Sequence, residues 1–221
     1  MKMKYKYLII LSLVIFLACL VYSFCIKDEP MGDERDYDEI ALSIAEGRGF
    51  LVDATAISKV CQGYILLLAG FYKVFGHHYV IVQIVQALLH ALSCLILFFI
   101  CVKIFEKDIS EKVGLVAMGL YGFWPDLIET TSMLEAETVF LFFAILSIYF
   151  AIEFFKKPDI KKALWLSLAI GLGASMRLTI VLFVLVIAIL LFVSKQIKRR
   201  YIYLIFFIPF IDSMMQFIKC S

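Results

Sequence analysis

Polar residues are scarce in this chain. Of its 221 residues, 63% are hydrophobic and the mean hydropathy is +0.97, whereas soluble domains are roughly 45–50% apolar. This shortage excludes an ordinary soluble domain. Only four prolines and eleven glycines interrupt the chain, which excludes collagen-like and disordered chains. The composition therefore predicts an all-α, polytopic transmembrane helical bundle.

Several motifs that carry chemistry in other proteins are also missing. The six cysteines show no C-x-x-C pairing or metal-type spacing, and most lie within apolar runs, where a thiol acts as a small hydrophobe. No disulfide framework is expected, and no metal ligand is assigned. The chain contains no P-loop, GxGxxG, GxSxG or HExxH motif, so nucleotide-driven and serine-hydrolase chemistry have no support. No nucleic-acid partner is expected.

Apolar runs long enough to cross about 30 Å of hydrocarbon predict about seven spans. The first could be a signal peptide, but its apolar stretch exceeds the usual length of about 7–15 residues and no A-x-A-like site follows, which favours a retained anchor. The fifth and sixth runs meet at Arg177, and we interpret them as two spans rather than one broken helix. The runs are residues 7–26, 79–102, 113–131, 134–155, 163–176 (extended towards 178), 179–194 and 201–218.

The basic residues indicate how these spans are oriented. A cytoplasmic N-terminus with alternating spans places most of the 21 basic residues on the inner face, as the positive-inside rule requires. The acidic segment after the first span then lies outside. We therefore predict a multi-pass plasma-membrane protein whose lysine-rich loops face the cytoplasm. The inner residues are Lys2, Lys4, Lys6, Lys103, Lys107, Lys112, Lys156, Lys157, Lys161, Lys162, Lys195, Lys198, Arg199 and Arg200.

The apolar run at 63–75 is too short to span and predicts an interfacial or re-entrant helix. Counting it as a span would invert every later loop and move the lysine-rich loops outside. We therefore expect residues 27–78 to form one extracytoplasmic loop carrying two short interfacial helices. The first should begin near Asp33 or Asp36, either of which can act as N-cap, and end at Gly47.

Five carboxylates lie between Asp33 and Glu39. Acids at a helix N-terminus complement the helix dipole, so we interpret Asp36, Asp38 and Glu39 mainly as capping and solvated residues. Asp33 follows the first span closely and has Glu34 beside it. These two are the candidates for functional carboxylates.

Two further charged residues lie at membrane boundaries. Glu137 begins the fourth predicted span, where an ionisable group usually faces a cavity or a partner; a solvated acid near a helix N-terminus is the alternative. Arg177 is a basic residue on the acidic side of the membrane. Its guanidinium could bind a phosphate through two hydrogen bonds, or it could extend to lipid headgroups or pair with a carboxylate.

The histidines and the amides within the second long span have less specific interpretations. His77 and His78 are interpreted as loop residues, because two adjacent histidines do not easily bind one metal ion from a helix. Gln83, Gln86 and His90 share roughly one face of the second long span. We expect these three to hydrogen-bond between helices.

The order of these motifs resembles the N-terminal half of the GT-C glycosyltransferases. It is most similar to the branch containing dolichyl-phosphate-mannose protein mannosyltransferases and lipid A aminoarabinose transferases. The resemblance covers about residues 5–195. It rests on Gly32-Asp33-Glu34, Tyr37-Asp38-x-Ile40-Ala41, Glu46-Gly47-Arg48-Gly49-Phe50, Gln62-Gly63-Tyr64, Phe71-Tyr72-Lys73-Val74-Phe75-Gly76, Tyr121-x-x-Trp124-Pro125, Leu134-x-Ala136-Glu137-Thr138 and Gly171-x-Gly173-x-x-x-Arg177.

The resemblance implies that a sugar moves from a polyprenyl-phosphate donor to an acceptor on the outer face of the membrane, with inversion at the sugar carbon. Asp33 would be the catalytic general base and Glu34 would assist it. Arg177 would stabilise the donor phosphate as it leaves. The supporting residues would be Glu137, Tyr37 and Tyr64. The implied partners are the lipid-linked donor, membrane lipids and an acceptor protein, lipid or glycan.

The chain also departs from the family pattern. Two prolines usual near Lys59–Ile65 are missing, and Leu178 stands where a proline usually follows the arginine. Family members are considerably longer, so residues 1–221 are expected to be one truncated GT-C-like transmembrane domain that could be inactive alone. A non-catalytic membrane protein that binds polyprenyl lipid or a partner protein is the alternative function, and a transporter ranks last. The sugar, the acceptor and the need for a divalent metal stay open.

Overall fold

The computed structural model describes residues 5–25, 30–49 and 62–177, together with 179 and 186. These residues form helices and no strand. The all-helical fold class is therefore confirmed for the described part. Its helices are α1 (Tyr5–Cys25), α2 (Asp33–Ala45), α4 (Gln62–Phe75), α5 (Tyr79–Ile104), α6 (Lys107–Gly122), α7 (Pro125–Glu129), α8 (Glu137–Lys156) and α9 (Ile160–Met176).

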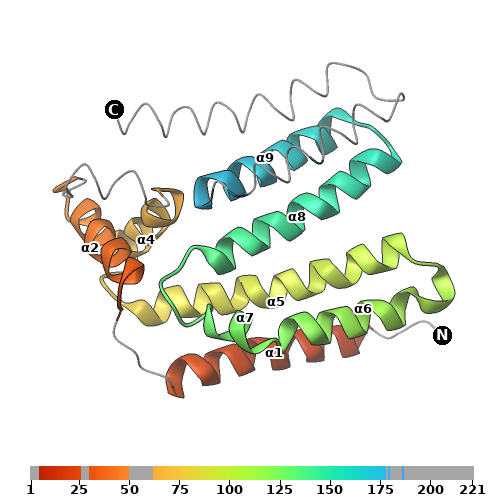
Figure 1. The fold of residues 1–221 in the computed structure, drawn as a ribbon, viewed down its shortest axis with the longest axis horizontal. Coiled ribbons are helices and arrows are strands. Elements are labelled where there is room, and N and C mark those ends of the chain that lie inside the picture. The colour runs from red at the N-terminus through yellow and green to blue at the C-terminus, as the bar shows by residue number, and fades with distance from the viewer. Residues whose placement is uncertain (1–4, 26–29, 50–61, 178, 180–185, 187–221) are drawn as a thin grey trace.

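The long helices form a bundle around α5. This helix packs against α1, α6 and α8, and α8 packs in turn against α9 (Figure 1). The shorter helices α2 and α4 pack on each other across one end of the bundle, where α4 also contacts α9. The predicted pair of short helices between the first two spans is therefore present.

Three of the described helices are long and apolar enough to cross a membrane, namely α1, α5 and α8. Helices α6 and α9 have 16 and 17 residues, which gives lengths of only about 24–26 Å. The protein is thus a membrane protein with three candidate spans in its described part. The predicted spans 179–194 and 201–218 lie outside the described residues, apart from residues 179 and 186.

The prediction of one continuous span over residues 113–131 is wrong. The helix α6 begins earlier, at Lys107, and ends at Gly122; a separate short helix, α7, follows. The break is at Trp124-Pro125, because proline disfavours helical backbone in the residue before it and fits the first turn of a new helix. Trp124 is extended (φ −68°, ψ 121°), and Pro125 opens α7.

The two ends of α2 are set by glycines. Asp33 is its first helical residue, and the N-cap is Gly32 at φ +59°, without a side-chain cap bond. The expectation that Asp33 or Asp36 is the N-cap is therefore wrong. The predicted stop at Gly47 is confirmed: its φ is +79°, and its N–H donates to the Ile44 carbonyl at 3.0 Å, the left-handed ending that glycine favours.

An apolar cluster holds α2 and α4 against the bundle. Tyr37, Ile40 and Ala41 of α2 are buried, as the helical spacing predicts. They pack with one side of α4 and with residues around the start of α8 and the end of α9. Burial of this kind is the main stabilising term for a short helix. The α4 side of the cluster comprises Tyr64, Ile65, Leu68, Ala69 and Tyr72.

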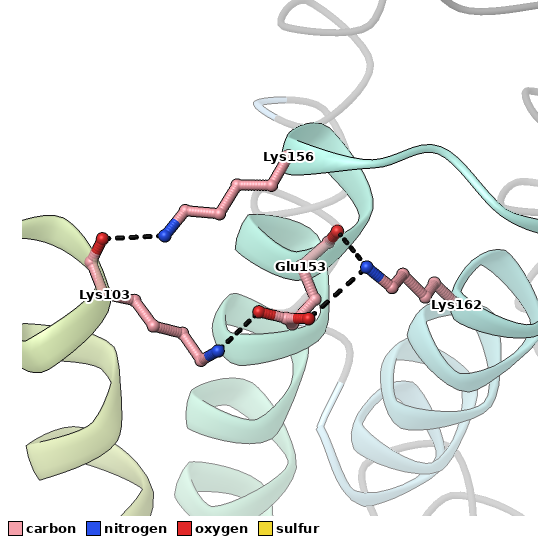
Figure 2. Close-up of polar contacts among 4 residues, drawn as sticks. All are labelled: Lys103, Glu153, Lys156 and Lys162. Carbon is pink, nitrogen blue, oxygen red and sulfur yellow. Dashed lines mark hydrogen bonds and ion pairs between the residues drawn. The ribbon is translucent and has the colours of Figure 1, made fainter.

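Lysines gather at the end of the bundle away from α2 and α4. Figure 2 shows Glu153 of α8 between two of them: Lys103 of α5 donates to Oε1 at 2.5 Å, and the Lys162 Nζ of α9 lies 3.4 Å from Oε2. Lys156 donates to the Lys103 carbonyl at 2.8 Å. These bonds tie together the ends of three helices. In the described part of the chain, the turns that carry Lys103, Lys156 and Lys162 therefore lie at the opposite end from the carboxylates of α2. Which end faces the cytoplasm stays a prediction.

Candidate functional site

The starts of α2 and α8, the end of α9 and the loop that precedes α8 lie at the end of the bundle that carries α2. Helix α2 starts there at Asp33, α8 starts at Glu137, and α9 ends just before Arg177. Each charge complements the helix end that carries it, since carboxylates are favoured at N-termini and cations at C-termini. The predicted residues Asp33, Glu34, Tyr37, Tyr64, Glu137 and Arg177 come from these elements and from α4.

Arg177 and Glu137 form an ion pair between the end of α9 and the start of α8. Both side chains are partly exposed, at 39% and 33%. The backbone of Arg177 is extended, and its N–H donates to the Gly173 carbonyl at 3.0 Å. The structure therefore holds the guanidinium at the bundle surface with one carboxylate beside it, where a further anion can reach it.

Glu135 is a site residue to which the sequence gave no role. Partial burial raises the pKa of its carboxyl, the negative charges of Asp33 and Glu129 raise it further, and the positive charge of Arg177 lowers it. Asp33 and Arg177 therefore both lie close enough to act on Glu135. Asp33, Glu135 and Arg177 therefore belong to the same end of the bundle.

Tyr64 of α4 is a buried phenol among the predicted site residues. Its side chain is fully buried, and its hydroxyl donates to Gln86 Oε1 at 2.8 Å. Burial raises the pKa of this phenol well above its usual value, and the charges of Glu34 and Glu135 raise it further. The Tyr37 ring meets the Tyr64 ring edge-on at 5.8 Å between centroids. Tyr64 therefore stays a neutral hydrogen-bond donor to Gln86.

Buried amides of α5 hold the loop that precedes Glu135. The Gln86 side chain donates to the carbonyls of Thr131 at 3.0 Å and Met133 at 2.7 Å, and Gln83 donates to the Ser132 carbonyl at 2.9 Å. Farther along, the His90 ring contacts the Gly122 carbonyl at 3.3 Å. The predicted bonds between helices are confirmed for Gln86, which accepts from Tyr64 of α4, and for His90, which contacts Gly122 of α6, whereas Gln83 bonds to the loop.

Replacing Gln86 by leucine should destabilise the protein by about 2 kcal/mol, because the Tyr64 hydroxyl and two loop carbonyls would lose their buried partner. The thermal midpoint in detergent measures this effect. Gln83→Leu is the matched control, since Gln83 is on the same helix and donates to one loop carbonyl, that of Ser132. Equal shifts for the two variants would show that the Gln86 network is not specifically stabilising.

Asp38 is not a solvated helix acid, and its interpretation as a capping or exposed residue is wrong. Its carboxylate is buried and accepts hydrogen bonds from Tyr72 at 2.6 Å and Tyr79 at 2.8 Å. His77 Nε2 lies 2.8 Å from the same carboxylate, so His77 is a bonded partner rather than a plain loop residue. Asp36 and Glu39 are exposed, as predicted.

Within residues 5–25, 30–49 and 62–177, no three histidine, cysteine or acidic side chains are grouped to hold a metal ion. Cys19, Cys25, Cys94 and Cys101 are free thiols, whereas Cys61 and Cys220 lie outside the described residues. The site as described consists of carboxylates, one guanidinium and phenols. Such a set can accept a proton and bind a phosphate.

Comparison with protein families finds a match over most of the chain. The family described as dolichyl-phosphate-mannose-protein mannosyltransferase matches residues 61–214. The matched segment includes Tyr64, Glu135, Glu137 and Arg177, and it begins after Asp33 and Glu34. Comparisons with curated proteins and with solved structures find no match.

Proposed function

Because the chain belongs to the dolichyl-phosphate-mannose-protein mannosyltransferase family of membrane glycosyltransferases, we propose that it transfers a sugar from a polyprenyl-phosphate donor at the acidic end of its bundle. The observation that supports this proposal is that Asp33 and Arg177, which are far apart in the sequence, both act electrostatically on the Glu135 carboxyl. The proposed orientation puts this end outside the cell, with about seven spans and a cytoplasmic N-terminus.

In the proposed reaction, Asp33 accepts the proton from the acceptor hydroxyl as that oxygen attacks the sugar carbon. Proton removal by a positioned carboxylate is general-base catalysis. The bond from the sugar carbon to the phosphate oxygen breaks, and its electron pair leaves with the phosphate. Attack opposite the leaving group inverts the sugar carbon. Glu34, one residue later on α2, assists Asp33.

Arg177 is the proposed ligand of the departing phosphate. A guanidinium already placed at the site stabilises the charge that develops on the leaving oxygen without reorganisation. Glu137 holds the guanidinium before the donor binds. Tyr37 and Tyr64 support the site from α2 and α4, because their rings are in contact and both are buried.

Replacing Arg177 by glutamine should weaken binding of bare polyprenyl phosphate about 10- to 100-fold, the loss expected for a charge-assisted hydrogen bond. The probe is bare polyprenyl phosphate titrated into the full chain in lipid nanodiscs. Transfer is measured in parallel with labelled polyprenyl-phosphate hexoses and pentoses.

Arg48→Gln is the matched control. Arg48 is exposed just after α2 and pairs with Glu46, so its loss removes the same charge away from Glu137. Its affinity should stay within about twofold of the unaltered protein. Equal weakening by both variants would indicate general electrostatic attraction and contradict a phosphate site at Arg177. Donor binding without transfer in the unaltered chain would favour the non-catalytic alternative.

A further inference from the structure

Asp38 is a buried carboxylate that the proposed reaction does not use. Its side chain is only 12% exposed. Oδ1 accepts from Tyr72 and lies within hydrogen-bond distance of His77, and Oδ2 accepts from Tyr79. Both oxygens are therefore engaged, so Asp38 is poorly placed to accept a proton from a substrate.

The three partners of Asp38 all lie outside α2. Tyr72 is on α4, His77 is in the turn after α4, and Tyr79 opens α5. The His77 ring packs edge-on against both phenols. Its centroid lies 4.7 Å from that of Tyr72 and 5.0 Å from that of Tyr79. One carboxylate of α2 is thereby bonded to two other helices and to the turn that joins them.

These bonds constrain α2 in a way that its apolar contacts do not. Tyr37, Ile40 and Ala41 bury one face of α2 against α4, but hydrophobic burial is non-directional and tolerates small shifts or rotations of a helix. Hydrogen bonds to a buried carboxylate are directional, and leaving that carboxylate without partners is costly. The bonds of Asp38 therefore fix both the rotation of α2 and its position along its axis.

We propose that Asp38 is a positioning residue that holds the start of α2, and with it Asp33 and Glu34, over the proposed phosphate site. Asp33 lies five residues before Asp38 on one continuous helix, so a rotation or slide at Asp38 is transmitted to Asp33. This inference rests on the proposed glycosyl transfer.

Replacing Asp38 by alanine should lower kcat about 10- to 100-fold, because a displacement near 1 Å can cost a factor of about 100 in rate. The KM for a labelled polyprenyl-phosphate sugar should stay within about twofold, since Arg177 and Glu137 lie on other helices. Asp38→Asn keeps the shape and an acceptor oxygen and should recover part of kcat. Tyr79→Phe removes one bond to Oδ2 and should produce a smaller loss.

Asp36→Ala is the matched control, because Asp36 is an exposed carboxylate on the same helix and its loss should leave kcat nearly unchanged. Hydrogen exchange supplies a second readout: amides of α2 should exchange faster in Asp38→Ala, while those of α5 stay protected. If Asp38→Ala does not fold, Tyr79→Phe tests the same inference, because it removes one hydrogen bond to Asp38 and keeps the aromatic ring.

The inference is overturned if kcat is unaltered in Asp38→Ala or Tyr79→Phe, or if KM rises in proportion to any fall in kcat. Failure of the proposed function would look different. If Asp33→Asn transfers sugar as well as the unaltered chain, the reaction assignment fails. If the unaltered chain transfers nothing, exchange in α2 still decides whether Asp38 holds the helix, and unchanged exchange in Asp38→Ala overturns the inference.

Discussion

Replacing Asp33 by asparagine should reduce sugar transfer about 10²- to 10⁴-fold, the range that a general base contributes. Asparagine has nearly the same shape and cannot accept the proton at neutral pH. Binding of bare polyprenyl phosphate should persist, because Arg177 and Glu137 are unchanged. Turnover of a labelled polyprenyl-phosphate sugar and the dissociation constant of bare polyprenyl phosphate are the two measurements.

Asp36→Asn tests whether this loss is specific. Asp36 is exposed and belongs to the same first turn of α2, so this variant removes the same charge from the same helix end. We expect nearly full turnover. If Asp36→Asn lowers transfer as much as Asp33→Asn, the acidic segment acts through its overall charge, and no single base is assigned.

Replacing Gly63 by alanine should disrupt both the stability and the activity of the protein. A Cβ atom at Gly63 would lie 2.5 Å from the Ser175 carbonyl oxygen and 2.7 Å from its carbon, so α4 and α9 would have to separate. Overpacking of this kind costs about 1–3 kcal/mol. Because Ser175 lies two residues before Arg177, the shift should also lower transfer by about 100-fold. The thermal midpoint and turnover measure the two effects.

Gly70 provides a matched control on the same helix. A Cβ atom there meets nothing within 4 Å, and alanine is the better helix former by about 1 kcal/mol. Gly70→Ala should therefore leave the protein as stable or more stable, with normal turnover. A similar midpoint for both variants would mean that α4 and α9 do not approach as closely as the structure shows.

The parts of the fold that the sequence predicted best are those with a strong local signal. The span beginning at residue 79 and the short helix at 63–75 follow from long apolar runs and helical spacing, and both were found within a few residues of the expected bounds. The run at 113–131 was predicted with wrong bounds, because apolar residues lie on both sides of Trp124-Pro125, whereas α6 ends at Gly122. A hydropathy average takes no account of the fact that a proline disfavours helical backbone in the residue before it.

The candidate site was predictable only where a charge conflicts with its surroundings. Arg177 and Glu137 stood out because ionisable groups at a membrane boundary are costly, and the structure pairs them. Their roles, like those of Asp33 and Glu34, stay predictions. The environment of Asp38 was not predictable, because its partners lie 34, 39 and 41 residues away in the chain and only tertiary packing brings them together.

The contact between Gly63 and Ser175 has a consequence for the order of synthesis. The α2 segment emerges from the ribosome early, whereas α9 is among the last described helices to be made. The carboxylates of α2 are therefore made before Arg177, which reaches the site only when α9 has packed against α4. A nascent chain interrupted before Arg177 would carry its proposed base but could not bind donor phosphate at Arg177. Assembly itself would thus delay the first turnover until α9 has packed against α4.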